Sequence, residues 1–239
     1  MLPETASTPM CFSSSASFVV AALLLPLGVG SVRYCQDQQR SDLLPLALTP
    51  LLFSLQQALE GLVWLGLEQG GSVWLVHPAA LGYLFFAYAF WLVWFPWCVL
   101  QLNLHAPPPL RRRILVGLMV LGLLMGGVLW LPLVVDPSLF QPAVVNGSLD
   151  YHTTLLTDRW IHLGFGSTIY AVIILGPLML SASGRLRWFA GGILAAFLIS
   201  HLAYGYAFAS VWCFFSAVLS ASLYWILRDP EPVVLPGLG

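Results

Sequence analysis

Four ionisable residues lie within or beside long apolar segments of this chain and are its best candidates for chemistry. They are Glu60, Asp158, His162 and His201. An ionisable side chain near the centre of a membrane helix costs at least ~2.5 kcal/mol, so such a residue usually faces protein or water and serves a function. If these segments cross a membrane, the four residues indicate where chemistry would occur.

Two histidines with one or two carboxylates can hold Zn²⁺ and leave one position open for water. We therefore expect His162, His201 and Glu60 as candidate metal ligands. Glu60 and Asp158 are the candidate catalytic carboxylates, and Asp158 precedes His162 by one helical turn, on the same face. This set would serve metal-dependent hydrolysis in a membrane hydrolase, with zinc as its cofactor.

Other interpretations of the same residues stay open. In a small-solute or proton-coupled transporter, Glu60 would titrate and His201 would relay the proton. In a membrane sensor, the group would line a pocket for a small ligand. In a structural role, a Glu–His pair would hold helices together and Asp158 would cap a helix. Residue type and spacing do not separate enzyme, transporter and sensor.

The composition favours a membrane setting. Of the 239 residues, 59% are hydrophobic and 8% are charged, whereas a soluble domain carries about a quarter charged residues. A chain this poor in charge cannot keep its folded surface in water, so the lipid bilayer is its expected partner. The net charge of −1, with no basic stripe, argues against nucleic acid. Lysine is absent, which excludes Schiff-base chemistry on lysine.

Seven apolar segments are each long enough to cross a bilayer as a helix, which takes about 20 residues. The predicted fold is an all-α membrane protein, a bundle of seven transmembrane helices in one integral membrane domain, residues 1–239. The uncharged run from Trp188 to Leu227 would form a helix of about 60 Å, so it must reverse once, near Gly205 to Ser210. The predicted spans are approximately 17–32, 44–67, 79–102, 114–134, 160–181, 188–208 and 211–227.

Arginine predicts the direction of the helices. With seven spans, every arginine except Arg159 falls on the same side of the membrane. The positive-inside rule makes that side cytoplasmic, so we expect the N-terminus outside and the C-terminus in the cytoplasm. Glu60, Asp158, His162 and His201 then share the outer leaflet. We expect them to form a polar pocket that opens outward and admits a small-molecule ligand.

Three short strings connect the chain to a known family. They are MCFSSSASF at 10–18, QQALEG at 56–61 and VWCFFSA at 211–217. The chain resembles an uncharacterised family of bacterial, notably cyanobacterial, multi-span membrane proteins that open with MCFSxxASF. The resemblance covers most of the chain. It implies a multi-pass protein of the bacterial inner (plasma) membrane, and it implies no activity.

The same resemblance bears on the N-terminus. The family usually begins at the methionine of MCFS, so Met10 is an expected start alongside Met1. A start at Met10 would place Cys11 beside a free N-terminus on the outer side. Cys213 is expected near the outer end of the last span. The two thiols would form a disulfide, join a metal site or pack as small apolar residues.

Overall fold

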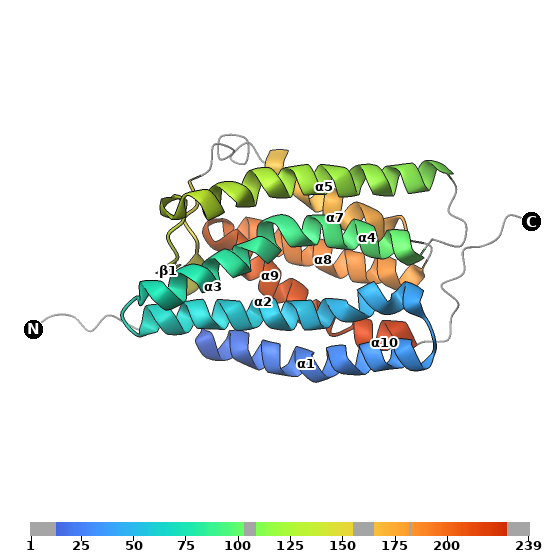
Figure 1. The fold of residues 1–239 in the computed structure, drawn as a ribbon, viewed down its shortest axis with the longest axis horizontal. Helices are drawn as coiled ribbons and strands as arrows, with labels where there is room; N and C mark the ends of the chain where they lie inside the picture. Colours follow the sequence, from blue (N-terminus) through green and yellow to red (C-terminus); the bar gives the residue numbers. More distant parts are fainter. Residues whose placement is uncertain (1–12, 103–108, 155–164, 182, 229–239) are drawn as a thin grey trace, which may run out of the picture.

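The computed structural model describes residues 13–102, 109–154, 165–181 and 183–228. Within these ranges the chain is almost entirely helical, and its helices lie side by side in a bundle (Figure 1). Its elements are α1 (Ser14–Asp37), η1 (Ser41–Leu43), α2 (Leu44–Glu68), α3 (Val73–Phe85), η2 (Phe86–Phe90), α4 (Trp91–Leu102), α5 (Pro109–Val135), η3 (Pro137–Leu139), β1 (Ala143–Val145), β2 (Ser148–Asp150), α7 (Phe165–Met179), α8 (Gly184–Ala203), η4 (Gly205–Ala207), α9 (Phe208–Ser220) and α10 (Leu223–Arg228).

Among the described residues, six helical segments are long and apolar enough to cross a membrane, which confirms the predicted bundle of apolar helices. Of the predicted fifth span, 160–181, the described part forms the shorter apolar helix Gly166–Met179. The predicted count of seven spans therefore stays a prediction. The six long segments are Ser14–Asp37, Ser41–Glu68, Val73–Leu102, Pro109–Val135, Gly184–Ala203 and Gly205–Arg228.

The long uncharged segment reverses close to the expected place. α8 ends at Ala203, the 3₁₀ turn η4 follows, and α9 begins at Phe208. Two backbone hydrogen bonds close the turn, from the Tyr204 N–H to the Ser200 carbonyl (3.0 Å) and from the Ala207 N–H to the Tyr204 carbonyl (2.9 Å). α8 and α9 then pack against each other.

A π-helical turn interrupts the third long segment. It spans Phe86–Phe90 between α3 and α4, and the helical segment changes direction there (Figure 1). Such turns are rare and are often found at functional sites, because the wider turn displaces side chains and frees backbone groups.

Two glycines one turn apart bring α5 against the π-turn and the start of α4. A Cβ atom on Gly122 would lie 2.2 Å from the Leu92 carbonyl oxygen, and one on Gly126 would lie 2.8 Å from the Ala89 Cα. Any larger residue would push the helices apart, so the Gly-x-x-x-Gly spacing permits this close contact. The contact fixes the position of η2 in the bundle.

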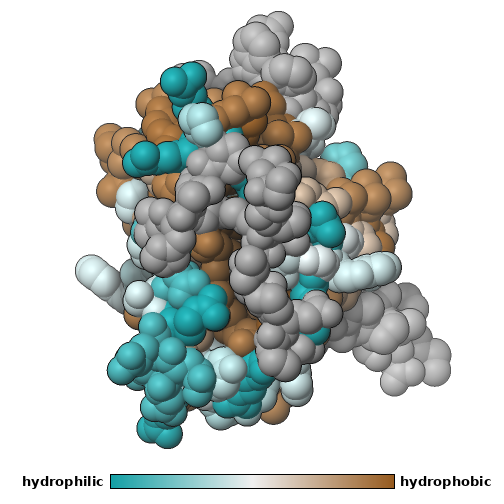
Figure 2. Space-filling model, turned by 90° about the vertical axis from the view of Figure 1, so that its right-hand side faces the viewer, coloured by the Kyte–Doolittle hydropathy of each residue, from teal (hydrophilic) through white to brown (hydrophobic). Residues whose placement is uncertain are grey.

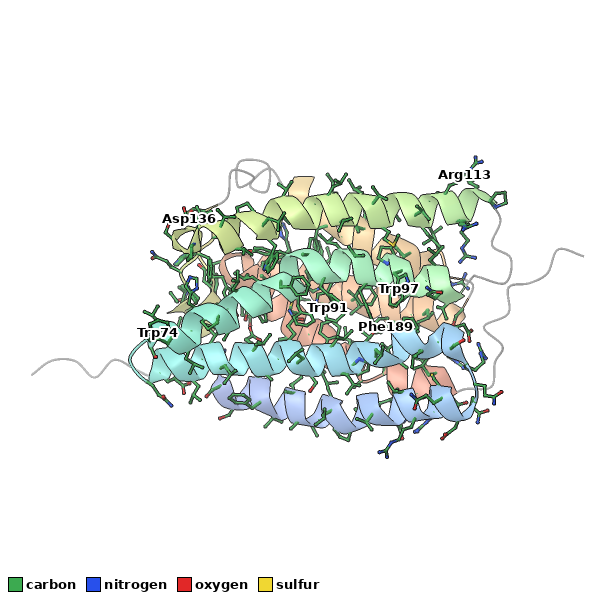
Figure 3. The ribbon with its side chains drawn as sticks, viewed as in Figure 1. Trp74, Trp91, Trp97, Arg113, Asp136 and Phe189 are labelled. Carbon is green, nitrogen blue, oxygen red and sulfur yellow. The ribbon has the colours of Figure 1, made fainter. Side chains whose placement is uncertain are left out.

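The two ends of the bundle differ in chemistry. Arg113 lies at the end where α10 and the C-terminal half of α1 lie, and Trp74 and Asp136 lie at the opposite end (Figure 3). At the end of Arg113, patches of hydrophilic side chains stand beside hydrophobic ones (Figure 2). The described arginines flank this end, since they lie at the end of α1, the start of α2, α5 and α8, and the end of α10. The orientation of the bundle in a membrane stays a prediction.

Candidate functional site

A β-hairpin forms the connection after α5. Val145 pairs with Ser148, and only Asn146 and Gly147 form the turn. Both have positive φ, 48° and 74°, as a two-residue type I′ turn requires, and Asn-Gly is its favoured sequence. Sequence reasoning missed this hairpin, although Asn-Gly directly after the short apolar run Ala143–Val145 was a usable signal. The hairpin lies at the end of the bundle that carries Trp74 and Asp136 (Figures 1 and 3).

A cavity of about 360 Å³, called here the hairpin cavity, lies between this hairpin and the helices. Its walls come from η2, α5, β2 and the residues after it, α7, η4 and α9. Small-molecule sites in proteins typically measure about 300–1,000 Å³. The hairpin cavity therefore has the volume of a binding site, and it joins segments from distant parts of the chain.

Tyrosines anchor the walls to the π-turn. The Tyr170 hydroxyl of α7 donates to the Ala87 carbonyl within η2. Tyr88, the next residue, shares a hydrogen bond of 3.3 Å with the Thr153 hydroxyl after the hairpin. All four residues line the cavity. The π-turn thus provides both an acceptor and a side chain to the wall.

Asp150 and His152 stiffen the rim of the cavity. The Asp150 carboxylate accepts from the His152 backbone N–H at 2.9 Å, and its other oxygen lies 2.9 Å from His152 Nδ1. His152 has a φ of 37°, in the left-handed region that non-glycine residues rarely adopt. The two contacts from Asp150 hold this conformation and so fix the direction of the one residue between them, Tyr151.

Tyr151 lies between these two rim residues and points inward. Its ring stacks on Tyr83 of α3, with centroids 4.9 Å apart and planes at 8°. Tyr151 is 3% exposed and Trp212 is 4% exposed, and both line the cavity. The Tyr151 hydroxyl and the Trp212 indole N–H have no hydrogen-bond partner among the described residues. A buried polar group without a partner costs about 1–3 kcal/mol, so the two groups reduce the stability of this wall.

A second, smaller space of about 20 Å³ continues toward the core. Tyr170, Trp212 and Cys213 border both spaces, and Trp91 borders only the inner one. Trp91 lies midway along the bundle (Figure 3) and donates to the Gln56 side-chain oxygen at 2.9 Å. The inner space has room for about one water molecule.

Glu60 lies behind the cavity wall and does not line it. It is 2% exposed, and the Ser210 hydroxyl donates to it at 2.5 Å. The Gln57 amide donates to its other oxygen at 3.1 Å, and Ser17 of α1 is a further hydrogen-bond partner. Ser210 follows Ala209, which lines the cavity and whose carbonyl accepts from the Tyr83 hydroxyl at 3.1 Å. One residue of α9 therefore separates Glu60 from the cavity.

The other predicted site residues are placed differently. His201 is exposed, and its ring packs against Phe197 and Phe208, each 5.9 Å away between centroids. It does not line the hairpin cavity. Asp158 and His162 lie outside the described residues, as does Cys11. Cys213 is a free, buried thiol in the cavity wall.

The predicted zinc site stays a prediction. Within the part of the chain that the structure describes, no three His, Cys, Asp or Glu side chains gather closely enough to hold a metal ion. Glu60 and His201 have different surroundings, one buried among hydroxyl and amide groups and the other exposed beside aromatic rings.

Comparison with known proteins identifies the family of the chain but gives no activity. No curated protein and no solved structure matches it. Residues 10–235 match the family of unknown function DUF6629. The expectation of an uncharacterised family is thus confirmed, whereas a bacterial origin and the MCFSxxASF opening stay predictions. Because the match covers nearly the whole chain, the protein belongs to the DUF6629 family of unknown function.

Proposed function

We propose that this protein is a multi-pass membrane protein that binds a small molecule in the hairpin cavity, as a receptor or carrier. The observation that supports this most directly is the hairpin cavity itself: at about 360 Å³ it has the volume of a small-molecule site, and its described wall combines aromatic side chains with a few polar groups such as Asp150 and Thr153.

The exposed surface supports insertion in a membrane. Leu123 and Leu124 in the middle of α5 are each 64% exposed, as expected for side chains that face lipid. Trp74, at the end of the bundle that carries the hairpin, is 93% exposed. Trp188, near the opposite end where the arginines lie, is 84% exposed. Tryptophan is enriched at both membrane–water interfaces. We propose that the arginine end is cytoplasmic, so that the cavity opens to the outside.

Proton-coupled transport is a second candidate, favoured by the position of Glu60. Its carboxyl group is buried one residue behind the cavity wall and is hydrogen-bonded to Ser210 of α9. A ligand that shifts α9 would change the surroundings of this carboxyl group. Proton flux into liposomes, compared between the wild type and Glu60→Gln, tests the role; unchanged flux would exclude it.

Metal-dependent hydrolysis has less support from the described geometry, because Glu60 and His201 do not share an environment. Metal analysis of the purified protein tests it. Stoichiometric zinc that is lost in His162→Ala and His201→Ala would favour a metal site over the binding function proposed here.

Labelling of Cys213 tests the binding function. Cys213 lines the cavity, whereas Cys98 is 0% exposed and borders neither described cavity. Two variants are made, one keeping only Cys213 and one keeping only Cys98, with the other cysteines changed to alanine. Both are treated in lipid nanodiscs with methyl methanethiosulfonate, a small neutral thiol reagent, and modification is followed by mass spectrometry.

An open cavity predicts that Cys213 reacts at least about 10-fold faster than Cys98. The variant Ala209→Leu, which adds carbon atoms to the cavity wall, should slow Cys213 but not Cys98. Equal rates for the two thiols in folded protein would mean that the cavity is closed, and the proposed function would then be wrong.

A further inference from the structure

We propose that the end of the bundle that carries the arginines binds an anionic phospholipid between the start of α5 and the start of α8. Arg113 of α5 and Arg187 of α8 would contact its phosphate group, and its acyl chains would lie on exposed apolar side chains beside them. The proposal depends on the membrane setting of the protein but not on the hairpin cavity, so it goes beyond the binding function proposed above.

Helix α7 brings the starts of α5 and α8 together, because it packs against both helices. A Cβ atom on Gly176 of α7 would lie 3.6 Å from Leu118 Cδ1, so the last turn of α7 lies beside the first turns of α5. The connection from α7 to α8 is tight: the Ser183 N–H donates to the Ser181 hydroxyl at 3.3 Å, and the Ser183 hydroxyl accepts from the Leu186 N–H at 3.4 Å. The start of α8 therefore adjoins the same end of α7.

Three arginines at these two helix starts are exposed: Arg112, Arg113 and Arg187. None of them forms an ion pair with another described residue. Arg111 and Arg185, at the same helix starts, are partly buried. The planar guanidinium group matches a phosphate group through paired hydrogen bonds. Exposed arginines on two neighbouring helices are therefore suited to hold a phosphate between them.

The sequence places no carboxylate next to these arginines. Residues 103–114 and 179–190 together contain five arginines and no Asp or Glu. Both stretches are counted in full, so the parts that lie outside the described residues are included. The segment after α10 contains Asp229 and Glu231, and two carboxylates are too few to balance five arginines. The surface between α5 and α8 therefore keeps a positive charge that an anion can neutralise.

The remaining arginines at this end already have counter-charges or other contacts. Arg40 forms an ion pair with Asp42 at 2.8 Å, and Arg33 lies one helical turn from Asp37 on α1. Arg228 lies over the Tyr224 ring at 3.7 Å. The unbalanced positive charge is thus confined to the starts of α5 and α8.

Apolar side chains stand directly beside the exposed arginines. Leu110 and Ile114 of α5, Met179 of α7 and Leu180 after it are all exposed, and so is Trp188, which follows Arg187. A soluble phosphate would contact the arginines alone and leave these side chains uncovered. A phospholipid covers both, since its headgroup is charged and its chains are apolar. Basic surfaces between membrane helices are typical headgroup sites, so the combination favours a lipid.

Native mass spectrometry of the full chain in detergent tests the proposal by counting bound lipids. The protein is mixed with equal amounts of phosphatidylglycerol, which is anionic, and phosphatidylcholine, which is zwitterionic, with the same acyl chains. The test variant combines Arg113→Gln with Arg187→Gln. The matched control combines Arg33→Gln with Arg40→Gln, which removes the same charge from the same end of the bundle.

We expect the wild type and the control to bind phosphatidylglycerol at least about 5-fold more tightly than phosphatidylcholine, and the test variant to lose most of this preference. If the test variant does not fold, Arg112→Gln with Arg187→Gln takes its place. An equal loss in the test and control variants would mean that only net charge matters, and the proposed site would be wrong.

Two further results would overturn the proposal. One is a wild-type protein without any preference for phosphatidylglycerol. The other is displacement of phosphatidylglycerol by an excess of inorganic phosphate, which would assign the arginines to a soluble anion. Neither result affects the hairpin cavity, whose binding function is tested separately by the labelling of Cys213.

Discussion

The Ser210 hydroxyl of α9 donates a hydrogen bond of 2.5 Å to the Glu60 carboxyl group of α2, across 150 positions of sequence. Both residues are buried, at 2% exposure each. The bond ties the second long helix of the bundle to the turn of α9 that lines the hairpin cavity. It therefore couples the buried carboxyl group to the shape of the candidate site.

Replacement of Glu60 should separate its size and hydrogen bonds from its charge. Glu60→Ala leaves Ser210 and Gln57 without their partner and opens a hole, so we expect the free energy of unfolding to fall by about 2–4 kcal/mol. Glu60→Gln keeps the size and can accept from Ser210, so its loss should stay below about 1 kcal/mol. Thermal unfolding in detergent measures both, and equal stability of the two variants would contradict the described contacts.

The contact of α5 with the start of α4 gives a prediction with a control on the same helix. A Cβ on Gly122 would meet the Leu92 carbonyl of α4, whereas one on Gly117 would meet no atom within 4 Å. Gly122→Ala should therefore lower the free energy of unfolding by about 1–3 kcal/mol. Gly117→Ala should be neutral or slightly stabilising. A stable Gly122→Ala variant with unchanged Cys213 labelling would show that α5 does not lie so close to α4.

The hairpin turn should control the cavity through its backbone. Gly147 has a φ of 74°, so Gly147→Ala is expected to cost about 1–2 kcal/mol locally and to change the rate at which Cys213 in the cavity wall is labelled. Asn146→Gly, at the neighbouring position with φ of 48°, is the matched change that adds no strain. Thiol labelling in nanodiscs compares the two variants. If Cys213 reacted at the same rate in both variants as in the wild type, the hairpin would not shape the site.

Asp136 predicts a pH dependence at the end of α5. The Ser138 hydroxyl and then the Ser138 backbone N–H, at 2.6 and 3.0 Å, hold the pKa of Asp136 below its ordinary value of 3.8. Because the pKa is depressed in the folded state, the stabilisation is present above the ordinary pKa and is lost as the pH falls through the folded value. The difference in unfolding temperature between the wild type and Asp136→Ala should therefore be largest near neutral pH and vanish in strong acid.

Ser138→Ala serves as the intermediate case for that prediction, because it removes the hydroxyl donor and keeps the backbone N–H. At neutral pH the unfolding temperature of Ser138→Ala should lie between those of the wild type and Asp136→Ala. A difference that grows toward acid pH would mean that Asp136 has the opposite linkage.

Much of the helical architecture was predictable, because long apolar runs must form helices in lipid. The reversal near η4 followed from length alone, since one uncharged run was twice as long as a bilayer needs. The π-turn was not predictable, because it depends on the fit of α5 against η2 through Gly122 and Gly126. Such a distortion has no local sequence signature.

The candidate site was predictable only in part. Glu60 was identified as a buried polar residue, and its level in the bundle followed from the span count. The surface position of His201 was not predicted: this residue is exposed, whereas its neighbour Ser200 is fully buried. In a membrane helix both faces are apolar, so the sequence does not reveal which face packs against protein. The aromatic cavity was missed because its residues come from five separate segments.

Photolabelling with benzophenone tests the central claim, that the hairpin cavity binds a small molecule. Benzophenone is a small ring compound that on irradiation inserts into nearby C–H bonds, so mass spectrometry of the adduct reports where it binds. We predict adducts on cavity residues, with Met125 of α5 the foremost, that are reduced by Ala209→Leu. Adducts confined to lipid-facing residues such as Leu123 and Leu124, unaffected by that variant, would contradict the account.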